Sequence, residues 1–445
     1  MRIQPARRVR GHLGRLPGDK SISHRAAIIA ALAHGQSRIT NFSTSEDCAS
    51  TLACLRQLGV SIERDERSVT IEGTGSEGSL RAPSQTLDCG NSGSTMRMLA
   101  GVLAGQRFVS ELTGDDSLRS RPMRRIIDPL EMMGADVASE MGHAPLLIKG
   151  RQPLMPIMYE MPVASAQVKS SILLAGLNAN GRTTVIEKSG ATRDHTERML
   201  RWFGVPVETR TGEHDDGWPD VVAVDGPAQF QARDVAIPGD ISSAAFFIAA
   251  AALLPGSTLE ISGVGLNPTR AQILRLLQSL GARARVHEMR EHCNETVGNV
   301  HVSASAKLSP AKPGHSNVLR GALVPRLIDE LPLLAVVGTQ VEGGITIRDA
   351  SELRVKETDR ISATVENLRA MGAEVEEYED GLSVAGQQAH LRGAALDARG
   401  DHRIAMAFTV AALVARGESE IIGAEECVGV SFPEFFRLLE LVVER

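Results

Sequence analysis

Cationic and hydroxyl side chains stand beside glycine at several points along the chain, each time just before an apolar run. The first stretch, "RLPGDKSISHR" at residues 15–25, places Lys20 and Ser21 at the start of an alanine-rich run. Free backbone N–H groups at a helix start, together with a lysine and a hydroxyl, favour an anion. Asp19 separates Gly18 from Lys20, which argues against the nucleotide-binding loop G-x-x-x-x-G-K-[ST] of kinases and ATPases. The stretch is interpreted either as a phosphate site or as an ordinary helix cap.

Similar polar residues recur in "GNSGSTMR", "SAQVKSS", "IDELP" and "GDHRIAM", again at expected helix starts. Each cation alone is best explained as a solvated helix-end charge, but recurrence at equivalent places favours a shared role. If these helix starts converge, they would line one cleft with cations. The cations are Lys20, Arg25, Arg97, Lys169 and Arg403.

Two further groups of charged residues lie before the second helix of their repeats. Arg121 is in "LRSRPMRR", and Lys356, Glu357 and Arg360 are in "RVKETDR". The spacing of the last three predicts that they share one helical face. Because charged residues recur at comparable places in the repeats, a purely solvated role for all of them is disfavoured.

The composition indicates a soluble globular protein of more than one domain. The chain has 445 residues, of which 42% are hydrophobic and 23% are charged. A net charge of -6 and an aromatic content of 3% argue against nucleic acid and anionic membranes as partners. The longest apolar run, Ala244–Leu254, is too short to span a bilayer.

Neither a metal nor a disulfide framework is expected. The five cysteines are Cys48, Cys54, Cys89, Cys293 and Cys427, and no C-x-x-C or H-E-x-x-H pattern occurs. The basic N-terminus lacks the apolar run of a signal peptide, so the cytoplasm is the expected location.

An internal repeat organises the chain. One element is an alanine-rich apolar helix, a glycine turn and a β-branched strand, as in "AAALLPGSTLEISG". Its glycines recur at intervals of roughly 70 to 90 residues, which predicts six units. They are Gly35, Gly105, Gly181, Gly256, Gly343 and Gly417.

A second, amphipathic helix alternates with the first and ends in a glycine before a strand, as in "TLACLRQLGVSI". We expect these glycines to form left-handed C-caps. They are Gly59, Gly134, Gly204, Gly281 and Gly372. Each unit therefore holds two helices and three or four strands, and the apolar helices should be buried beneath outer sheets.

Six units of this size fit two α/β domains of three units each. The two "PGD" turns, at residues 17–19 and 238–240, open the first helix of each triplet. We therefore expect one domain from residues 1–19 plus 238–445 and another from 20–237, with a double crossover near 17–20 and 237–240. Clefts between domains commonly hold small ligands.

The motifs together resemble the 5-enolpyruvylshikimate-3-phosphate synthase family, from Leu16 to about Pro433. They are "LPGDKSISHR", "CGNSGSTMR", "RSRPM", "SAQVKSS", "LRVKETDR" and "GDHRIAMAF". The resemblance implies two domains of three βαβαββ units, an inside-out α/β barrel that closes about its crossover. It also implies transfer of the enolpyruvyl group of phosphoenolpyruvate to the 5-hydroxyl of shikimate 3-phosphate. The reaction passes through a tetrahedral ketal, releases phosphate, needs no cofactor and belongs to chorismate and aromatic amino acid biosynthesis.

The resemblance also implies residue roles. Lys20 would assist departure of phosphate, Asp329 would accept the 5-hydroxyl proton, and Glu357 would protonate C3 and later remove that proton beside Lys356. Shikimate 3-phosphate is expected at Lys20, Ser21, Arg25, Ser165, Ala166, Gln167, Arg193, Asp329 and Lys356. Phosphoenolpyruvate is expected at Lys20, Gly93, Arg121, Gln167, Arg360 and Arg403.

The chain departs from the family pattern at two positions. Val430 stands where many members have a lysine, and Thr192 stands where some have a tyrosine, with Arg193 as its expected replacement. "SAQVK" and "RDHTE" resemble the branch associated with glyphosate tolerance, whereas Gly93 leaves the expected inhibitor site without a crowding methyl group. We weight the glycine more heavily and expect glyphosate to compete with phosphoenolpyruvate. A monomer is expected.

Two other functions are compatible with an anion site, a related transferase activity and non-catalytic binding. The related transferase that acts on UDP-N-acetylglucosamine carries a cysteine in the mobile loop of its second unit, and "LTGDDSLRSRP" has none. A non-catalytic scaffold that binds an anion is the other alternative. Asp329 and Glu357 argue against it, because carboxylates weaken anion binding and are expected there only if they move protons.

Overall fold

The computed structural model describes residues 1–75, 80–188, 190–210, 220–305, 308–309, 317–387 and 391–445. The chain forms two compact units. Unit 1 consists of Met1–Pro17, Pro238–Glu291 and Thr296–Arg445, and unit 2 consists of Gly18–Ile237 and His292–Glu295. No helix among the described residues is both long and apolar enough to cross a membrane.

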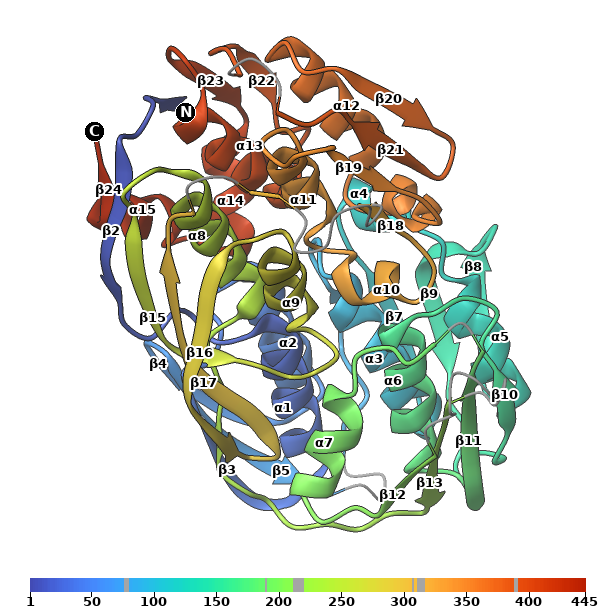
Figure 1. Ribbon diagram of the computed structural model, residues 1–445. Coiled ribbons are helices and arrows are strands. Elements are labelled where there is room, and N and C mark those ends of the chain that lie inside the picture. The colour runs from blue at the N-terminus through green and yellow to red at the C-terminus, as the bar shows by residue number, and fades with distance from the viewer. Residues whose placement is uncertain (76–79, 189, 211–219, 306–307, 310–316, 388–390) are drawn as a thin grey trace. The chain divides into compact units, whose positions relative to one another are not determined.

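Unit 2 contains three four-stranded sheets within its described residues (Figure 1). In each sheet the first two strands pair in parallel and the remaining neighbours pair antiparallel. The first sheet has the order β14 (Val235–Ala236), β3 (His34–Thr40), β5 (Ser68–Thr74) and β4 (Ser61–Asp65). The second has β6 (Leu87–Asp88), β7 (Val109–Thr113), β9 (His143–Lys149) and β8 (Asp136–Glu140). The third has β10 (Met158–Glu160), β11 (Gly181–Glu187), β13 (Asp220–Gly226) and β12 (Val207–Arg210).

The helices of unit 2 alternate between a buried and an amphipathic type. The buried ones are α1 (Lys20–Leu32), α3 (Gly93–Ala104) and α6 (Ala166–Gly176). The others are α2 (Glu46–Gln57), α4 (Asp116–Arg119), α5 (Arg124–Met132) and α7 (His195–Trp202). The third repeat, for example, runs β10, α6, β11, α7, β12 and β13, which is the βαβαββ order.

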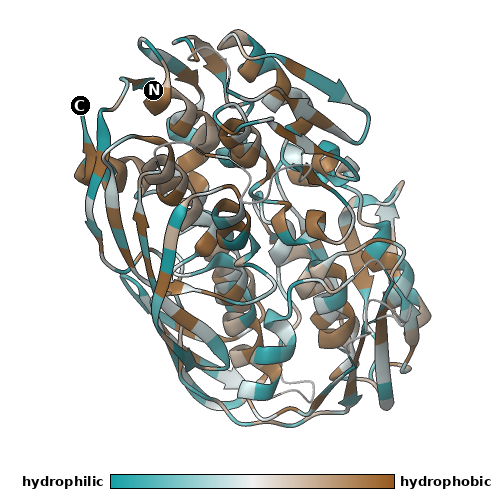
Figure 2. Cartoon of the chain, viewed as in Figure 1, coloured by the Kyte–Doolittle hydropathy of each residue, from teal (hydrophilic) through white to brown (hydrophobic). Residues whose placement is uncertain are grey.

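The buried helices form the core of unit 2. Figure 1 shows α3 and α6 side by side, and Figure 2 shows how strongly apolar they are. Gly101 makes this close packing possible, because a Cβ there would lie 2.1 Å from the Ser171 carbonyl oxygen of α6. The strands bury only one face, as the alternating burial along β9 illustrates. The helices therefore lie inside and the sheets outside.

Unit 1 is built in the same way. Its sheets have the orders β16-β17-β15-β2-β24, β18-β19-β21-β20 and β1-β23-β22. The strands are β1 (Arg2–Ile3), β2 (Arg8–Leu13), β15 (Thr258–Gly265), β16 (Arg283–His292), β17 (Glu295–Ser303), β18 (Val318–Leu319), β19 (Ile345–Ile347), β20 (Val375–Tyr378), β21 (Gly381–Val384), β22 (Ala395–Asp397), β23 (Ser419–Ile422) and β24 (Val443–Glu444).

The helices of unit 1 again include three that are apolar and buried, namely α8 (Ile241–Leu253), α11 (Leu331–Gly338) and α13 (His402–Val414). The others are α9 (Gln272–Ser279), α10 (Leu323–Leu327), η1 (Ser351–Val355, a 3-10 helix), α12 (Arg360–Ala370), α14 (Ala424–Ser431) and α15 (Phe435–Val442). Burial of helices that are apolar all round removes their whole surface from water, which is the main stabilising term for such a core.

The helix ends follow the sequence signals. The Asp19 carboxylate accepts the Ile22 N–H at the start of α1, and the Asp240 carboxylate accepts the Ser242 N–H at the start of α8. These caps lie in the two "PGD" turns, so the predicted helix starts are confirmed. The five glycines predicted to end the amphipathic helices all have positive φ, for example 88° at Gly59, and this prediction is also confirmed.

Candidate active site

The predicted residues of α1 lie in a hydrogen-bonded setting at the start of that helix. Lys20 is its first residue, and its Nζ lies 2.9 Å from Asp47 Oδ2 on α2. Arg25 is 3% exposed, and its Nη1 donates to the Ser21 carbonyl oxygen at 2.8 Å. The first two turns of the helix thus present a lysine and a buried guanidinium.

Arg25 is also held by the other helices of unit 2. Its Nε donates to Thr196 Oγ1 on α7 at 2.7 Å, and its Nη2 donates to Ser170 Oγ on α6 at 2.8 Å. These two hydroxyls are 2.6 Å apart and bond each other. Three helices therefore fix the plane of one guanidinium.

The start of α6 carries Ser165, Ala166 and Gln167. Ser165 is the N-cap, and its hydroxyl accepts the Val168 N–H. The Gln167 amide is held by α3, because its Oε1 accepts from Arg97 Nη1 and its Nε2 donates to Ser94 Oγ at 2.8 Å. Arg97 therefore orients a predicted substrate contact. Its place in "GNSGSTMR" was the available signal, but the sequence assigned it only a general cationic role.

Gly93 and Arg121 lie near the same guanidinium. Gly93 is the first residue of α3, and a Cβ built on it would be 2.8 Å from Arg97 Nη1 and 3.4 Å from Arg121 Nη1. Arg121 is buried, and its Nη2 donates to Asn91 Oδ1 at 2.7 Å and to Ser117 Oγ at 3.2 Å. The absence of a side chain at Gly93 leaves room for two cations beside one backbone turn.

Arg193 is half-buried in the link between β11 and α7. The preceding residue, Thr192, donates its backbone N–H to Glu187 Oε1 at the end of β11, at 3.0 Å. The nine predicted residues of unit 2 thus occupy helix starts or the links that lead into helices. They are Lys20, Ser21, Arg25, Gly93, Arg121, Ser165, Ala166, Gln167 and Arg193.

Arg360 is the centre of the predicted cluster in unit 1. It is the first residue of α12 and is 2% exposed. Its Nε donates to Asp401 Oδ2 at 2.7 Å, and its Nη2 donates to Glu357 Oε2 at 2.6 Å. Burial lowers the pKa of Arg360, but the charges of Asp401, Glu357 and Asp329 outweigh it and raise the pKa further above its usual value.

One nitrogen of this guanidinium has its hydrogen-bonding capacity unused among the described residues. Arg360 Nη1 is buried and makes no hydrogen bond within the described residues, although Asp329 Oδ1 lies 3.5 Å away. A buried N–H without an acceptor costs free energy, so such a group is suited to a ligand oxygen.

Arg403 lies at the start of α13, beside the same carboxylates. Its Nη2 is 3.9 Å from Asp329 Oδ2, and its Nη1 is 3.9 Å from Glu330 Oε1. Asp401 caps α13 by accepting the Arg403 backbone N–H at 2.8 Å. Asp401 also accepts from the Arg360 side chain. One fully buried carboxylate therefore holds the Arg360 guanidinium and the start of the helix that carries Arg403.

The predicted helical face for Lys356, Glu357 and Arg360 is wrong in part. Lys356 and Glu357 lie in the link between η1 and α12, and only Arg360 is helical. The helix starts late because Asp359 caps it by accepting the Ile361 and Ser362 N–H groups. Glu357 still contacts Arg360, three residues away.

The unit 1 carboxylates keep some access to solvent. The side chains of Asp329 and Glu357 are 18% and 21% exposed, respectively. Burial lowers the pKa of Lys356 below its usual value, and the Arg360 charge adds to this effect, against the opposing charges of Asp329 and Glu357. A lysine with a lowered pKa beside two carboxylates can take part in proton transfer.

Lys169 does not line a cleft with the other cations. Its side chain is 1% exposed and lies between Glu187 and Glu197, with Nζ 2.9 Å and 2.7 Å from their oxygens. The sequence motif placed it correctly on α6 but could not show that its partners are buried carboxylates of the same unit.

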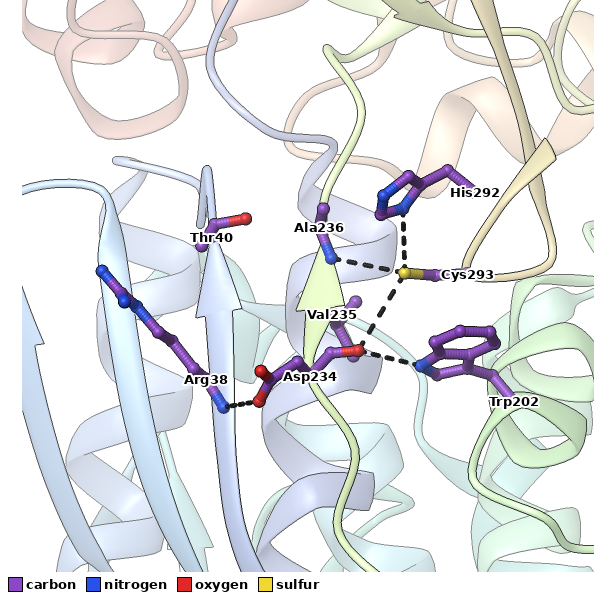
Figure 3. Close-up of a pocket in the computed structure, with 8 residues that line it drawn as sticks. All are labelled: Arg38, Thr40, Trp202, Asp234, Val235, Ala236, His292 and Cys293. Atoms are coloured by element: carbon purple, nitrogen blue, oxygen red, sulfur yellow. Dashed lines mark hydrogen bonds between the residues drawn. The ribbon is translucent and has the colours of Figure 1, made fainter. Parts of the chain in front are cut away.

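A separate cavity of about 250 Å³ lies in unit 2 (Figure 3). Its walls are the residues drawn in the figure, which include Arg38, Trp202 and Cys293. Trp202 Nε1 donates to the Asp234 carbonyl oxygen at 3.0 Å, and Cys293 Sγ accepts the Ala236 N–H at 3.5 Å. The predicted site residues are not part of this lining. Among the described residues, no group of three His, Cys, Asp or Glu side chains is arranged to hold a metal ion.

A family model described as EPSP synthase (3-phosphoshikimate 1-carboxyvinyltransferase) matches residues 3–439. The chain belongs to the EPSP synthase family. The resemblance carried by the six motifs is thereby confirmed.

Relatives across the EPSP synthase family match over the whole chain. The 3-phosphoshikimate 1-carboxyvinyltransferase of Koribacter versatilis is 52% identical over 100% of this chain and 99% of its own length. The protein of the same name from Geobacter sp. (strain M21) is 47% identical over the same shares of the two chains. This coverage includes all the motifs described above.

Solved structures confirm the fold class. EPSP synthase from Acinetobacter baumannii superposes with a TM-score of 0.84 at 39% identity, over 99% of this chain and 98% of that one. The enolpyruvyl transferase NikO from Streptomyces tendae, at 20% identity, superposes with a TM-score of 0.74 over 100% of this chain and 97% of its own. The predicted two-domain α/β architecture of enolpyruvyl transferases is therefore confirmed.

Proposed function

We propose that this chain transfers the enolpyruvyl group of phosphoenolpyruvate to the 5-hydroxyl of shikimate 3-phosphate and releases phosphate. Membership of the EPSP synthase family supports the reaction. The observation that carries it in the structure is Arg360, a buried guanidinium whose Nη1 makes no hydrogen bond within the described residues and which lies beside two partly exposed carboxylates. This arrangement can bind an anion and move protons at the same place.

Most of the residues that we assign to shikimate 3-phosphate belong to unit 2. Ser21, Arg25, Ser165, Gln167 and Arg193 would bind its phosphate and hydroxyl groups, with the Ala166 backbone N–H at the start of α6. The geometry at Arg25 supports this, because three helices hold its guanidinium in one orientation before any ligand arrives. Preorganised charge-assisted donors bind a phosphate at low entropic cost.

Phosphoenolpyruvate is assigned to the arginine groups and to Lys20 and Gln167. Arg121, Arg360 and Arg403 would bind it, and Gly93 leaves space beside Arg121. Planar guanidinium forks match carboxylate and phosphate oxygens. Lys20 would stabilise the charge that develops on the departing phosphate.

Proton transfer is assigned to two carboxylates of unit 1. Asp329 would accept the proton of the 5-hydroxyl as that oxygen adds to C2, and Lys356 would take part in binding shikimate 3-phosphate beside it. Glu357 would deliver a proton to C3 to form the tetrahedral ketal and then remove a C3 proton as phosphate leaves. Arg360 Nη2 donates to Glu357 Oε2, which holds the carboxylate in place for this transfer.

Release of phosphate from phosphoenolpyruvate tests the assignment. We expect rapid release with shikimate 3-phosphate, a background rate without an acceptor, and no acceleration with UDP-N-acetylglucosamine. Acceleration by the UDP-sugar would show the related transferase activity instead. Stoichiometric binding of shikimate 3-phosphate without phosphate release would show a non-catalytic scaffold.

The proposal extends to inhibition, oligomeric state and location. Glyphosate would compete with phosphoenolpyruvate, because Gly93 puts no side chain beside Arg97 and Arg121. The chain would act as a monomer, since one copy supplies every assigned residue, and sedimentation during turnover tests this. The cytoplasm is the proposed location because all five cysteines are free thiols.

A further inference from the structure

Unit 2 contains a buried cluster of three charged side chains that the reaction does not use directly. Lys169 of α6 lies between Glu187, at the end of β11, and Glu197 of α7. We call these three residues the Lys169 cluster. Their side chains are 1%, 2% and 2% exposed.

Burying the Lys169 cluster in the core costs free energy, because three charged groups lose their hydration. Desolvation of a lysine and two carboxylates costs several kcal/mol per ion, and apolar residues of similar volume often stabilise a fold as well or better. Burial lowers the pKa of Lys169, but the two carboxylates outweigh it and raise the pKa, so the lysine is charged. Glu197 Oε2 is buried without a hydrogen bond in the described part of the chain. The cluster is therefore not optimised for stability alone.

Each member of the cluster is linked to a residue that we assign to shikimate 3-phosphate. Lys169 follows Gln167 by two positions on α6. Glu187 uses Oε2 for Lys169 and Oε1 for the Thr192 N–H, next to Arg193. Glu197 follows Thr196, whose hydroxyl accepts from Arg25.

We propose that Lys169 is a positioning residue for shikimate 3-phosphate, which fixes the start of α6, the Arg193 link and α7 in one arrangement through its two buried glutamates. The proposal rests on the proposed function. Lys169 itself touches no substrate. Its role is to keep three separate binding segments in fixed positions relative to one another. Its loss should therefore weaken binding of shikimate 3-phosphate far more than binding of phosphoenolpyruvate.

Steady-state kinetics of Lys169→Met tests this. Methionine has a similar length but cannot bridge the glutamates. We expect KM for shikimate 3-phosphate to rise by roughly 10- to 100-fold, because small displacements of binding groups have effects of this size. We expect KM for phosphoenolpyruvate, at saturating shikimate 3-phosphate, to rise much less, by about threefold at most, because Gln167 is the one residue near the cluster that we also assign to phosphoenolpyruvate and α3 holds its amide. Lys169→Arg, which keeps the charge, should recover much of the affinity.

Lys188→Met is the matched control. Lys188 directly follows Glu187 but is exposed, and it pairs with the exposed Glu160. Exposed pairs contribute little, so both KM values should stay at the parent level.

Glu187→Gln keeps the test possible if Lys169→Met does not fold. A glutamine has one acceptor oxygen and must give up either Lys169 or the Thr192 N–H, so the same selective rise in KM for shikimate 3-phosphate is expected. An equal rise in both KM values, or a fall in melting temperature with both KM values unchanged, would overturn the positioning role. A parent chain that releases no phosphate with shikimate 3-phosphate would refute the proposed function instead.

Discussion

Gly93→Ala adds one methyl group at the start of α3, and the structure indicates what that methyl would meet. The new Cβ would lie 2.8 Å from Arg97 Nη1. Ordinary contact begins near 3.4 Å, so the guanidinium must move by about 0.6 Å. That movement is available because the group is the end of a flexible side chain, and we expect the variant to fold normally.

The movement of the Arg97 guanidinium weakens a hydrogen bond at the site. Arg97 Nη1 donates to Gln167 Oε1, and a hydrogen bond from a charged donor contributes about 1.5 to 3 kcal/mol. Relaxation of the neighbouring side chains recovers part of this free energy. KM for phosphoenolpyruvate should therefore rise by roughly tenfold. Glyphosate is longer and would also meet the methyl directly, which adds an overpacking cost of about 1 to 3 kcal/mol. We therefore expect its inhibition constant to rise roughly 5- to 150-fold more than KM.

The assay compares the glyphosate inhibition constant against varied phosphoenolpyruvate in the parent and in Gly93→Ala. Gly14→Ala is the control, because a Cβ at Gly14 would meet no atom within 4 Å. An unchanged inhibition constant in Gly93→Ala would show that this turn does not border the inhibitor. Equal rises in KM and in the inhibition constant would refute the direct contact and leave only the displacement of Arg97.

Three other changes test separate groups. Glu357→Gln can still accept from Arg360 but cannot carry a proton, so turnover should fall by about 100-fold or more with little change in substrate affinity in equilibrium titrations. Arg121→Ala should weaken phosphoenolpyruvate binding by roughly 2 to 4 kcal/mol, and equal directly measured affinity would place Arg121 outside the site. Burial lowers the pKa of His24 to about 4, so the unfolded chain binds the extra proton between about pH 6.5 and 4, and stability is lost as the pH falls through that window. Urea unfolding should show a loss of about 3 kcal/mol there that His24→Asn removes, because asparagine retains an uncharged partner for Thr51, and an unchanged pH dependence would contradict this origin.

The elements were predictable where short-range signals determine them. Asp19 and Asp240 cap their helices because a carboxylate before an apolar run can accept free N–H groups in any tertiary context. Gly59 and its four equivalents end helices for an equally local reason, the left-handed backbone. Burial of α8 followed from its lack of any polar face.

The partners of the charged groups were not predictable, because they are set by packing between distant segments. Nothing near Arg25 in the chain indicates that Thr196 and Ser170 hold it. Lys169 has the same motif context as the other cations, yet its burial depends on β11 and α7. The helical face proposed for Lys356 failed for a local reason, since the capping signal of Asp359 was missed. The roles of the site residues remain predictions.

The pairing of strands also determines when each unit can be completed during synthesis. In unit 2, β14 pairs with β3, so the segment from Gly18 to Ile237 closes on itself. In unit 1, β1 pairs with β23 and β2 pairs with β24, so its first strands lack these partners until about 200 further residues have followed Ile237. At a typical elongation rate of about 5 to 20 residues per second, that delay is roughly 10 to 40 s. During that interval β1 lacks β23, and β2 can pair with β15 at one edge only. The edge of β2 that later receives β24 stays exposed, and an exposed strand edge of this kind is where misassociation with other chains begins.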